Sequence, residues 1–574
     1  MSRSKYDSLS REQLIDKIQK LEKERYGLVW EDKEEDVAKR CEVELPLLLE
    51  DHSREIICDP ALPYNILIEG DNYHSLYALS FTHKKRIDVI YIDPPYNTGN
   101  KDFKYNDAYV DKDDTYKHSK WLSFMSKRLR LAKHLLKMNG VIFISINEEE
   151  FAQLKLLCDS IFGESNYLTT FTIKVRHEDR ILKGDKDYHE VVEYLLLYRR
   201  SKDHKTLKRE FDNTSIDDYV YTIDELNEFP SQITLGGKKV CVFAPGEFNI
   251  KKGNMPSEDN FKKINIRGSI KDGNSSGRFF MKYLSEKIGK EFGTLYKVEG
   301  LGDDKFDFRY FYIPDKKNRV NGDYFQGVPV HKDDIKEVPY PNFFDFVEDF
   351  NNVGYEGGVE FRNGKKPINF IKKIIELSGL RNGIVLDFFA GSASTAHAIL
   401  NLNTDGGKRR FILCTNNENN ICTEITYPRI KNVINGYSNI KGIPANLKYY
   451  KQTFVPIVSS DNDKRELVNR STEILCVAED CFEKVRERDN QSDYSVYKNR
   501  KKQMAIIYDE DSISDCIEYL NTHCSEHETV IYVFSYDHTY DAEDFARLNI
   551  KFSVKPIPEA IINVYRKISK MKKK

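Results

Sequence analysis

The chain has 574 residues, 31% of them charged and 40% hydrophobic, and a formal net charge of −2. This length predicts several domains, and the near-neutral charge gives no overall preference for nucleic acid. The first residues are polar and no apolar run reaches about 18 residues, so we expect neither a signal peptide nor a membrane span. Ten cysteines without C-x-x-C spacing predict reduced thiols in a soluble cytoplasmic protein and no metal site.

A charged helix with a narrow apolar stripe is predicted near the N-terminus. Ser10 and Gln13 have the spacing of a capping box. Apolar residues recur at helical spacing from Leu14 to Leu21. Such a stripe faces either a partner or the body of the protein. We interpret residues 1–50 as an N-terminal helical contact segment.

Strands and helices alternate from residue 64 to residue 198. The predicted strands are 65–69, 89–92, 141–146 and 191–198, and the predicted helices are 73–80, 121–137 and 151–162. This alternation predicts an α/β fold with a doubly wound, mostly parallel, Rossmann-like sheet. We assign residues 51–200 to the first half of the domain that contains this sheet.

The strand 89–92 ends abruptly in Asp93-Pro94-Pro95-Tyr96. The two prolines lack N–H donors and fix φ, so the strand must stop there. Ligands bind at the carboxyl ends of strands in open α/β sheets. The Asp93 carboxylate and the Pro94 carbonyl could bind an exocyclic amino group, and Tyr96 could stack on a flipped base. The alternative interpretation is a Pro-Pro turn that Asp93 caps.

The pattern changes over residues 201–345, where short aromatic strands alternate with Gly-rich turns. Within 248–290, ten lysines or arginines stand against four acids, and aromatic residues lie between them. Basic residues interleaved with aromatics are typical of a nucleic-acid-binding face. The alternative interpretation is a solvated charged surface.

The alternation of strands and helices returns over residues 346–454. A buried strand, 383–387, ends in Asp387, and small residues follow from Ala390 onward. Small side chains let a ligand approach the backbone, and the next helix N-terminus favours an anionic group. Glu418 follows the next strand, where nucleotide-binding sheets bind a ribose hydroxyl. The chain has neither a G-x-G-x-x-G motif nor a phosphate loop, which disfavours nicotinamide binding and NTP hydrolysis.

The pattern of apolar and polar residues over 455–574 predicts a small C-terminal α/β domain. The predicted strands are 474–477, 504–508 and 529–535, and the predicted helices are 512–524 and 559–570. No cluster of catalytic residue types is present in this segment. We therefore expect it to serve in dimerisation or in docking a partner.

Two distant motifs resemble one enzyme family. Asp93-Pro-Pro-Tyr96, with Asp387-Phe-Phe-Ala-Gly-Ser392 later in the chain, is similar to amino-group DNA methyltransferases that use S-adenosylmethionine. The order of the motifs resembles the permuted beta class. Further segments resemble the modification subunits of type III restriction–modification systems, over most of residues 20–450: 26–32, 93–99, 266–270, 302–304, 309–310, 324–329, 356–358 and 366–367.

The resemblance implies roles for individual residues. The catalytic residues would be Asp93, Pro94, Pro95 and Tyr96. S-adenosylmethionine would be held by Asp71, Lys366, Pro367, Asp387, Phe389, Ala390, Gly391, Ser392 and Glu418. The inserted segment 201–345 would be a mixed α+β target-recognition domain with DNA-binding residues Lys262, Lys263, Arg267, Lys271 and Arg278. One departure is Ala393, since the family commonly has a second glycine there.

The activity implied by the resemblance is direct in-line methyl transfer to adenine N6 in double-stranded DNA, with base flipping. The implied partners are a second copy of the chain and a separate restriction subunit with helicase and nuclease activities. One alternative is a cytosine-N4 methyltransferase, although such enzymes usually carry Ser in place of Asp93. Another alternative is a catalytically weak scaffold that only reads DNA. The chain has no Pro-Cys dipeptide, so a cytosine-C5 mechanism is unsupported.

Overall fold

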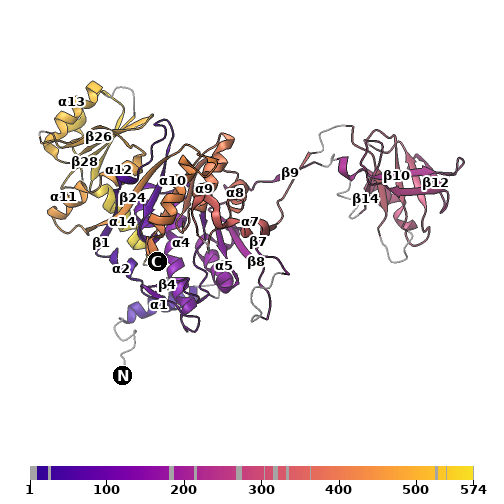
Figure 1. Ribbon diagram of the computed structural model, residues 1–574, viewed down its shortest axis with the longest axis horizontal. Helices are drawn as coiled ribbons and strands as arrows, with labels where there is room; N and C mark the ends of the chain where they lie inside the picture. The colour runs from indigo at the N-terminus through magenta and orange to yellow at the C-terminus, as the bar shows by residue number, and fades with distance from the viewer. Residues whose placement is uncertain are drawn as a thin grey trace. The chain divides into compact units, whose positions relative to one another are not determined.

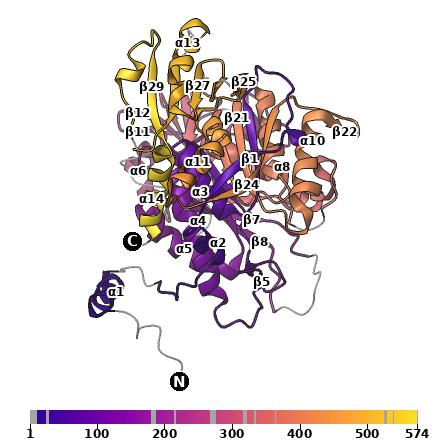
Figure 2. The same ribbon diagram turned by 90° about the vertical axis from the view of Figure 1, so that its left-hand side faces the viewer.

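The structure is a computed structural model (Figures 1 and 2). It describes residues 10–23, 28–179, 187–212, 216–266, 275–302, 304–314, 321–330, 335–361, 364–490, 492–523, 528–537 and 539–572. The chain forms two compact units, one from Met1–Leu207 together with Pro341–Lys574 and the other from Lys208–Tyr340. The second unit falls inside the segment predicted as the inserted domain, 201–345. The five-part domain division remains a prediction.

A ten-stranded sheet organises the first unit, in the order β1-β24-β2-β21-β20-β3-β6-β8-β7-β19. Its strands are β1 (Glu44–Glu50), β2 (Tyr64–Glu69), β3 (Ile87–Ile92), β6 (Leu136–Ile146), β7 (Tyr167–Lys174), β8 (Val192–Arg199), β19 (Phe343–Asp345), β20 (Asn382–Asp387), β21 (Lys408–Thr415) and β24 (Asn446–Pro456). The strands from β24 to β6 are parallel. The predicted α/β, mostly parallel fold is therefore confirmed.

Two strands of this sheet, β1 at one edge and β8 near the other, run against the rest. β1 runs antiparallel to β24, and β8 runs antiparallel to both β6 and β7. The predicted strand 191–198 is thus one of the strands outside the parallel set of this mostly parallel sheet. β7 and β8 follow each other without an intervening helix among the described residues, so β8 returns beside β7 as in a hairpin. Its first residues consequently lie at the same edge as the carboxyl ends of the parallel strands.

Helices pack in two groups on the sheet of the first unit. The helices of this part are α1 (Arg11–Lys23), α2 (Asp36–Arg40), α3 (Asn72–Thr82), α4 (Lys117–Leu135), α5 (Glu148–Phe162), α7 (Val347–Asn351), α8 (Ile368–Leu377), α9 (Ser394–Leu402) and α10 (Tyr427–Asn435). α4 contacts both α3 and α5, and α9 contacts both α8 and α10. The two groups are purple and orange in Figure 1.

The winding of the chain reverses between β20 and β3. From β2 through β3 to β6 the chain moves toward one edge of the sheet, and from β20 through β21 to β24 it moves toward the other. Right-handed crossovers in opposite directions place their helices on opposite faces. The neighbouring strands β20 and β3 thus form a topological switch point, the place where open α/β sheets bind ligands.

A predicted helix end and a predicted strand differ from the structure. α4 ends at Leu135 and β6 begins at Leu136, so the helix predicted to residue 137 is two residues too long. The predicted strand 474–477 is wrong, because these residues lie inside α12 (Thr472–Glu479). A run of four apolar residues does not distinguish a strand from a fully buried helix. The predicted capping box of α1 is present, since Ser10 N donates to Gln13 Oε1 at 2.9 Å and Gln13 N to Ser10 Oγ at 3.2 Å.

Residues after 456 build a second, five-stranded sheet within the first unit, in the order β25-β26-β27-β28-β29. Its elements are β25 (Glu483–Arg486), β26 (Tyr494–Lys498), β27 (Lys502–Ile507), β28 (Glu528–Phe534), β29 (Phe552–Ile557), α11 (Asp461–Asn469), α12, α13 (Ile513–His523) and α14 (Glu559–Lys572). α12 and α14 both contact α3, and the Tyr565 hydroxyl donates to the Pro46 carbonyl at 2.8 Å. The C-terminal elements therefore share a core with the first half of the large sheet.

The second unit contains a six-stranded antiparallel sheet in the order β11-β12-β15-β16-β17-β14. Its elements are β9 (Arg209–Asp212), β10 (Tyr221–Glu225), β11 (Ser231–Leu235), β12 (Lys238–Phe243), β13 (Phe248–Lys252), β14 (Lys262–Asn265), α6 (Ser275–Tyr283), β15 (Leu295–Glu299), β16 (Phe308–Tyr312), β17 (Asp323–Gln326) and β18 (Ile335–Val338). Its core is rich in aromatic residues. Across both units, none of the helices that the structure describes is long and apolar enough to cross a bilayer.

Candidate active site

The two strand ends singled out in the sequence lie side by side at the switch point. β20 pairs in parallel with β3, with Val385 opposite Val89 and Leu386 opposite Ile90. Asp387 is the last residue of β20, and Asp93 is the first residue after β3. Both carboxylates therefore lie at the ligand-binding edge of the sheet, although residues 93 and 387 are far apart in the sequence.

Asp93 belongs to a compact network of four polar side chains. The Tyr96 hydroxyl donates to Asp93 Oδ1 at 2.8 Å, and Lys366 Nζ lies 3.3 Å from the same oxygen. Lys366 Nζ also donates to the Tyr96 hydroxyl at 2.7 Å and to Glu193 Oε2 at 2.5 Å. The Tyr96 hydroxyl lies 3.0 Å from Glu193 Oε2. One ammonium thus lies between two carboxylates.

Burial changes the acid–base properties of this network. Burial raises the pKa of Asp93; the Lys366 ammonium opposes this change and the Glu193 carboxylate adds to it. Burial also raises the pKa of Tyr96 well above its usual value, with further contributions from Asp93 and Glu193. Burial opposes the charge of Lys366, but Asp93 and Glu193 outweigh it and raise the pKa of that ammonium. Lys366 therefore stays charged while it holds both acids.

The Pro94-Pro95 turn is anchored from the helix layer. The buried Trp121 indole of α4 donates to the Pro95 carbonyl at 2.8 Å. Asn97 follows in the left-handed region with φ of 60°, and its side-chain amide donates to the buried Glu150 carboxylate at 2.5 Å. These bonds fix the backbone on both sides of Tyr96.

Asp387 organises the loop that follows β20. Its Oδ1 accepts the Phe389 backbone N–H at 2.9 Å, and its Oδ2 accepts the Thr395 hydroxyl at 2.6 Å. The side chain is 3% exposed, and this burial raises its pKa to about 7. Asp387 thus ties the end of β20 to α9.

The loop itself is a tight, mostly buried turn with open space in front of Gly391. Ala393 N donates to the Ala390 carbonyl at 2.8 Å. A Cβ added to Gly391, which has φ of +46°, would meet only the Phe389 carbonyl, 3.8 Å away. Ala393 adopts φ of 61° and ψ of 32°, a conformation that costs an L-residue roughly 1 kcal/mol and that glycine adopts freely. The glycine common in the family at this position would relieve that strain.

Arg429 of α10 clamps the same loop from behind. This side chain is fully buried, and its Nη1 donates to the Ser392 carbonyl at 3.1 Å and to the Ser394 hydroxyl at 2.9 Å. Its Nη2 lies 3.2 Å from Glu356 Oε2. Burial lowers the pKa of Arg429 to about 10, and Glu356 opposes that change. The clamp joins the loop to the segment that precedes Lys366.

The other residues assigned to the cofactor lie at the same edge in different surroundings. Asp71 caps α3 by accepting the Tyr73 N–H at 2.7 Å, and the neighbouring Asn72 amide donates to the Phe388 carbonyl at 3.0 Å. Pro367 is the N-cap of α8. Glu418, after β21, is ion-paired with Lys104. Lys366 is brought to Asp93 and Tyr96 rather than to the 387–395 loop. The assigned cofactor roles of all these residues remain predictions.

Four residues that the sequence reasoning missed take part in the site: Glu193, Arg429, Asn72 and Trp121. Glu193 lies near the start of β8, and knowledge that this strand is antiparallel would have placed it at the ligand edge. Arg429 is a charged residue on the apolar face of a short helix, between buried Thr426 and Ile430. A charge in such a position signals a buried partner.

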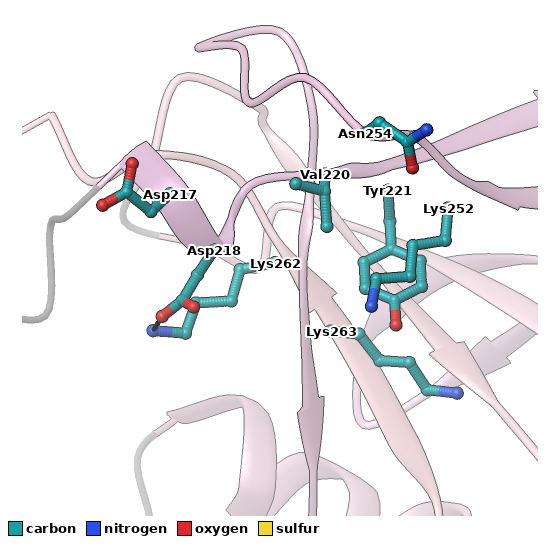
Figure 3. A pocket seen from close by; sticks show the side chains of 9 residues that line it. Asp217, Asp218, Val220, Tyr221, Lys252, Asn254, Lys262 and Lys263 are labelled. Atoms are coloured by element: carbon teal, nitrogen blue, oxygen red, sulfur yellow. Dashed lines mark hydrogen bonds and ion pairs between the residues drawn. The ribbon is translucent and has the colours of Figure 1, made fainter.

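Three lysines of the second unit, Lys252, Lys262 and Lys263, line a cavity of about 520 Å³ (Figure 3). Lys262 Nζ lies 2.7 Å from Asp218, and Lys263 Nζ lies 3.0 Å from the buried Asp323. Lys252 is exposed and lies beside Tyr221. Arg278 is exposed on α6, whereas the predicted Arg267 and Lys271 fall outside the described residues. The DNA-binding assignment remains a prediction.

The fold and this edge define an α/β protein with a cluster of acidic and aromatic side chains beside a tight loop that is open in front of Gly391. Residues 87–427 match the family described as DNA methylase. The StyLTI Mod subunit of Salmonella typhimurium, a type III restriction-modification enzyme, is 30% identical over 401 residues, 65% of this chain and 56% of that protein. The EcoPI Mod subunit of Escherichia phage P1 is 30% identical over 69% of this chain and 64% of its own length.

A third relative is matched over most of its own length. The type II methyltransferase M.KpnI of Klebsiella pneumoniae is 32% identical over 396 residues, 67% of this chain and 87% of that protein. The chain belongs to the DNA methylase family. It spans only about half to two thirds of the length of the two Mod subunits.

The raised pKa of Asp387 predicts a pH-dependent stability. Between about pH 4 and pH 7 the unfolded chain has an ionised Asp387 while the folded chain keeps the proton, so rising pH disfavours the folded state. The cost approaches about 1.4 kcal/mol per pH unit in this interval. We expect the Asp387→Asn variant to gain thermal stability relative to the wild type as pH rises from about 5 to 7. A difference in melting temperature that does not change with pH would contradict the assignment.

Proposed function

We propose that the chain is a site-specific DNA methyltransferase that transfers a methyl group from S-adenosylmethionine to adenine N6 in double-stranded DNA. The observation that carries the proposal is the adjacency of two strand ends, since Asp93 with its aromatic neighbour lies beside the start of the 387–395 loop. A methyl donor and an acceptor amine must be held next to each other, and this edge offers a place for each. Family membership and the Asp93-Pro-Pro-Tyr96 sequence support an amino group as the acceptor.

The residues of the 387–395 loop fit the cofactor. The space in front of Gly391 leaves the backbone open to a ligand, and the α9 N-terminus beyond it favours a carboxylate. Bound S-adenosylmethionine would supply a methyl group on a positively charged sulfur. Phe389, Gly391 and Ser392 would hold it, with Asp71 and Glu418 on the neighbouring strand ends.

The residues around Asp93 would orient the amine. Asp93 and the Pro94 carbonyl would accept hydrogen bonds from its two N–H groups and so reduce the delocalisation of the nitrogen lone pair into the ring. The flipped base would stack on the face of Tyr96. These residues would thus present the nitrogen lone pair to the methyl group that S-adenosylmethionine would supply, with the electron pair of the broken carbon–sulfur bond left on sulfur. The methylated nitrogen loses its extra proton along its hydrogen bond to Asp93 and from there to water. Removing the base from the duplex costs a few kcal/mol.

The proposal extends to partners. Relatives named as Mod subunits of type III restriction-modification enzymes support a role as the modification and DNA-recognition subunit of such a system, with a separate restriction subunit. We include a homodimer in the proposal, with the exposed Ile15 and Ile18 of α1 as candidate contacts. The inserted segment 201–345 would select the target sequence. The proposal also places the chain in the cytoplasm with its DNA.

The Asp93→Ala variant tests the catalytic assignment. We expect methyl transfer to long unmodified phage DNA to fall by at least about 10²-fold, because the amine loses its acceptor. DNA binding should stay within about twofold of the wild type, because phosphate contacts dominate affinity. The measurement is incorporation of tritiated methyl groups. Asp461→Ala, at a carboxylate that is 71% exposed on α11, is the control, and full activity in Asp93→Ala would contradict the assignment.

A separate prediction concerns DNA binding by the lysines of the second unit. The exposed Lys252 is freer to meet a phosphate than Lys263, whose ammonium is held by the buried Asp323. We expect Lys252→Gln to weaken DNA binding equally for all sequences and to reduce the slope of log K against log salt by about 1. Titration at several salt concentrations measures this slope. Lys551→Gln, at a residue 81% exposed in the C-terminal part, is the control, and an unchanged slope for Lys252→Gln would contradict the contact.

A further inference from the structure

Glu193 reaches the active-site edge because its strand runs against the others. The central strands end at this edge, whereas antiparallel β8 begins there, and Glu193 is the second residue of β8. Its side chain is 15% exposed. A carboxylate this far from water needs partners, and it has two, Lys366 Nζ at 2.5 Å and the Tyr96 hydroxyl at 3.0 Å.

Both partners of Glu193 are also partners of Asp93. Lys366 Nζ is 3.3 Å from Asp93 Oδ1 and Tyr96 donates to the same oxygen at 2.8 Å. A carboxylate oxygen that already receives two donors has little remaining capacity for the N–H of a substrate amine. The target amine can therefore bind Asp93 Oδ1 only when these donors move away. The Glu193 carboxylate is an acceptor within reach of both donors, Lys366 Nζ and the Tyr96 hydroxyl.

Glu193 also contributes to the net charge of the network. Asp93 and Glu193 face one ammonium, so the ionised trio carries one net negative charge. Two further titratable side chains interact with these acids. Tyr91 of β3 is buried with its hydroxyl 3.1 Å from Ser145, and the carboxylate of Asp387 at the end of β20 interacts with Asp93. The amine nitrogen becomes positively charged as it gains a methyl group. A net negative surrounding stabilises that charge, and a neutral surrounding does so less.

We propose that Glu193 is a positioning residue for methyl transfer, which takes Lys366 and the Tyr96 hydroxyl from Asp93 Oδ1 so that this oxygen is free to hold the target amine. The inference rests on the proposed function. In the structure the donors are shared between the two acids, and the shorter Lys366–Glu193 distance shows which acid holds the ammonium more closely. In the Glu193→Gln variant, Asp93 is the one carboxylate of the network that remains, and the Lys366 ammonium stays ion-paired with it. The amine must then compete with a buried ammonium for Asp93.

The experiment compares Glu193→Gln with the wild type in the full-length chain, using long unmodified phage DNA and tritiated S-adenosylmethionine. We expect kcat to fall by about 10- to 100-fold, while the affinity for S-adenosylmethionine, measured by calorimetry, stays within about twofold because Glu193 does not reach the 387–395 loop. Glu193→Asp keeps the charge and should recover part of the rate. Glu178→Gln removes a carboxylate ion-paired with Lys174, 62% exposed and outside the network, and should leave kcat unchanged.

The pH dependence separates positioning from a merely structural role. Glu193 raises the pKa of both Asp93 and Lys366. In Glu193→Gln we therefore expect the acid limb of the kcat profile to move to lower pH and Lys366 to become more reactive toward acetic anhydride near neutral pH, followed by peptide mass spectrometry. An unchanged kcat or an unmoved profile, with an active wild type, would overturn the inference alone. A wild type that transfers no methyl group to any DNA would overturn the proposed function.

Discussion

The active-site edge depends on one buried ammonium. Lys366 is 7% exposed and lies against Asp93, Tyr96 and Glu193. Two carboxylates this close would repel each other in a medium of low dielectric constant, and the ammonium between them makes the arrangement possible. The position of Lys366 depends in turn on the segment before α8, where Lys365 donates to the Gly354 and Val359 carbonyls at 2.6 Å. The backbone of that segment therefore places the charge that holds the acids.

A second constraint couples this ammonium to the cofactor side. Glu356 accepts the Ile368 N–H at 3.3 Å, close to Lys366, and it is ion-paired with Arg429. Arg429 in turn holds the 391–394 turn through Ser392 and Ser394. The residues assigned to the amine and those assigned to the methyl donor are thus linked through hydrogen bonds and the short backbone segment from Lys366 to Ile368. Rigid mutual placement of this kind is what an in-line transfer requires.

The sequence was sufficient for the elements that local patterns specify. Strand 89–92 was predictable because an apolar run ends close to two prolines, and the loop after Asp387 because small residues follow a buried strand. The direction of β8 was not predictable, since the apolar run 191–198 is the same in a parallel or an antiparallel strand, and Glu193 was missed for that reason. Residues 474–477 were misassigned because four apolar residues suit a buried helix as well. Ion pairs such as Lys263–Asp323 join distant parts of the chain and leave no local signal.

The central claim is that the base held at Asp93 is adenine. The most direct test is to incubate unmodified phage DNA with the full-length chain and S-adenosylmethionine, digest it to nucleosides and separate them by liquid chromatography and mass spectrometry. The account predicts N6-methyladenine as the new nucleoside, dependent on an intact Asp93. N4-methylcytosine as the product, or DNA without any methylated nucleoside while the chain binds S-adenosylmethionine, would contradict it.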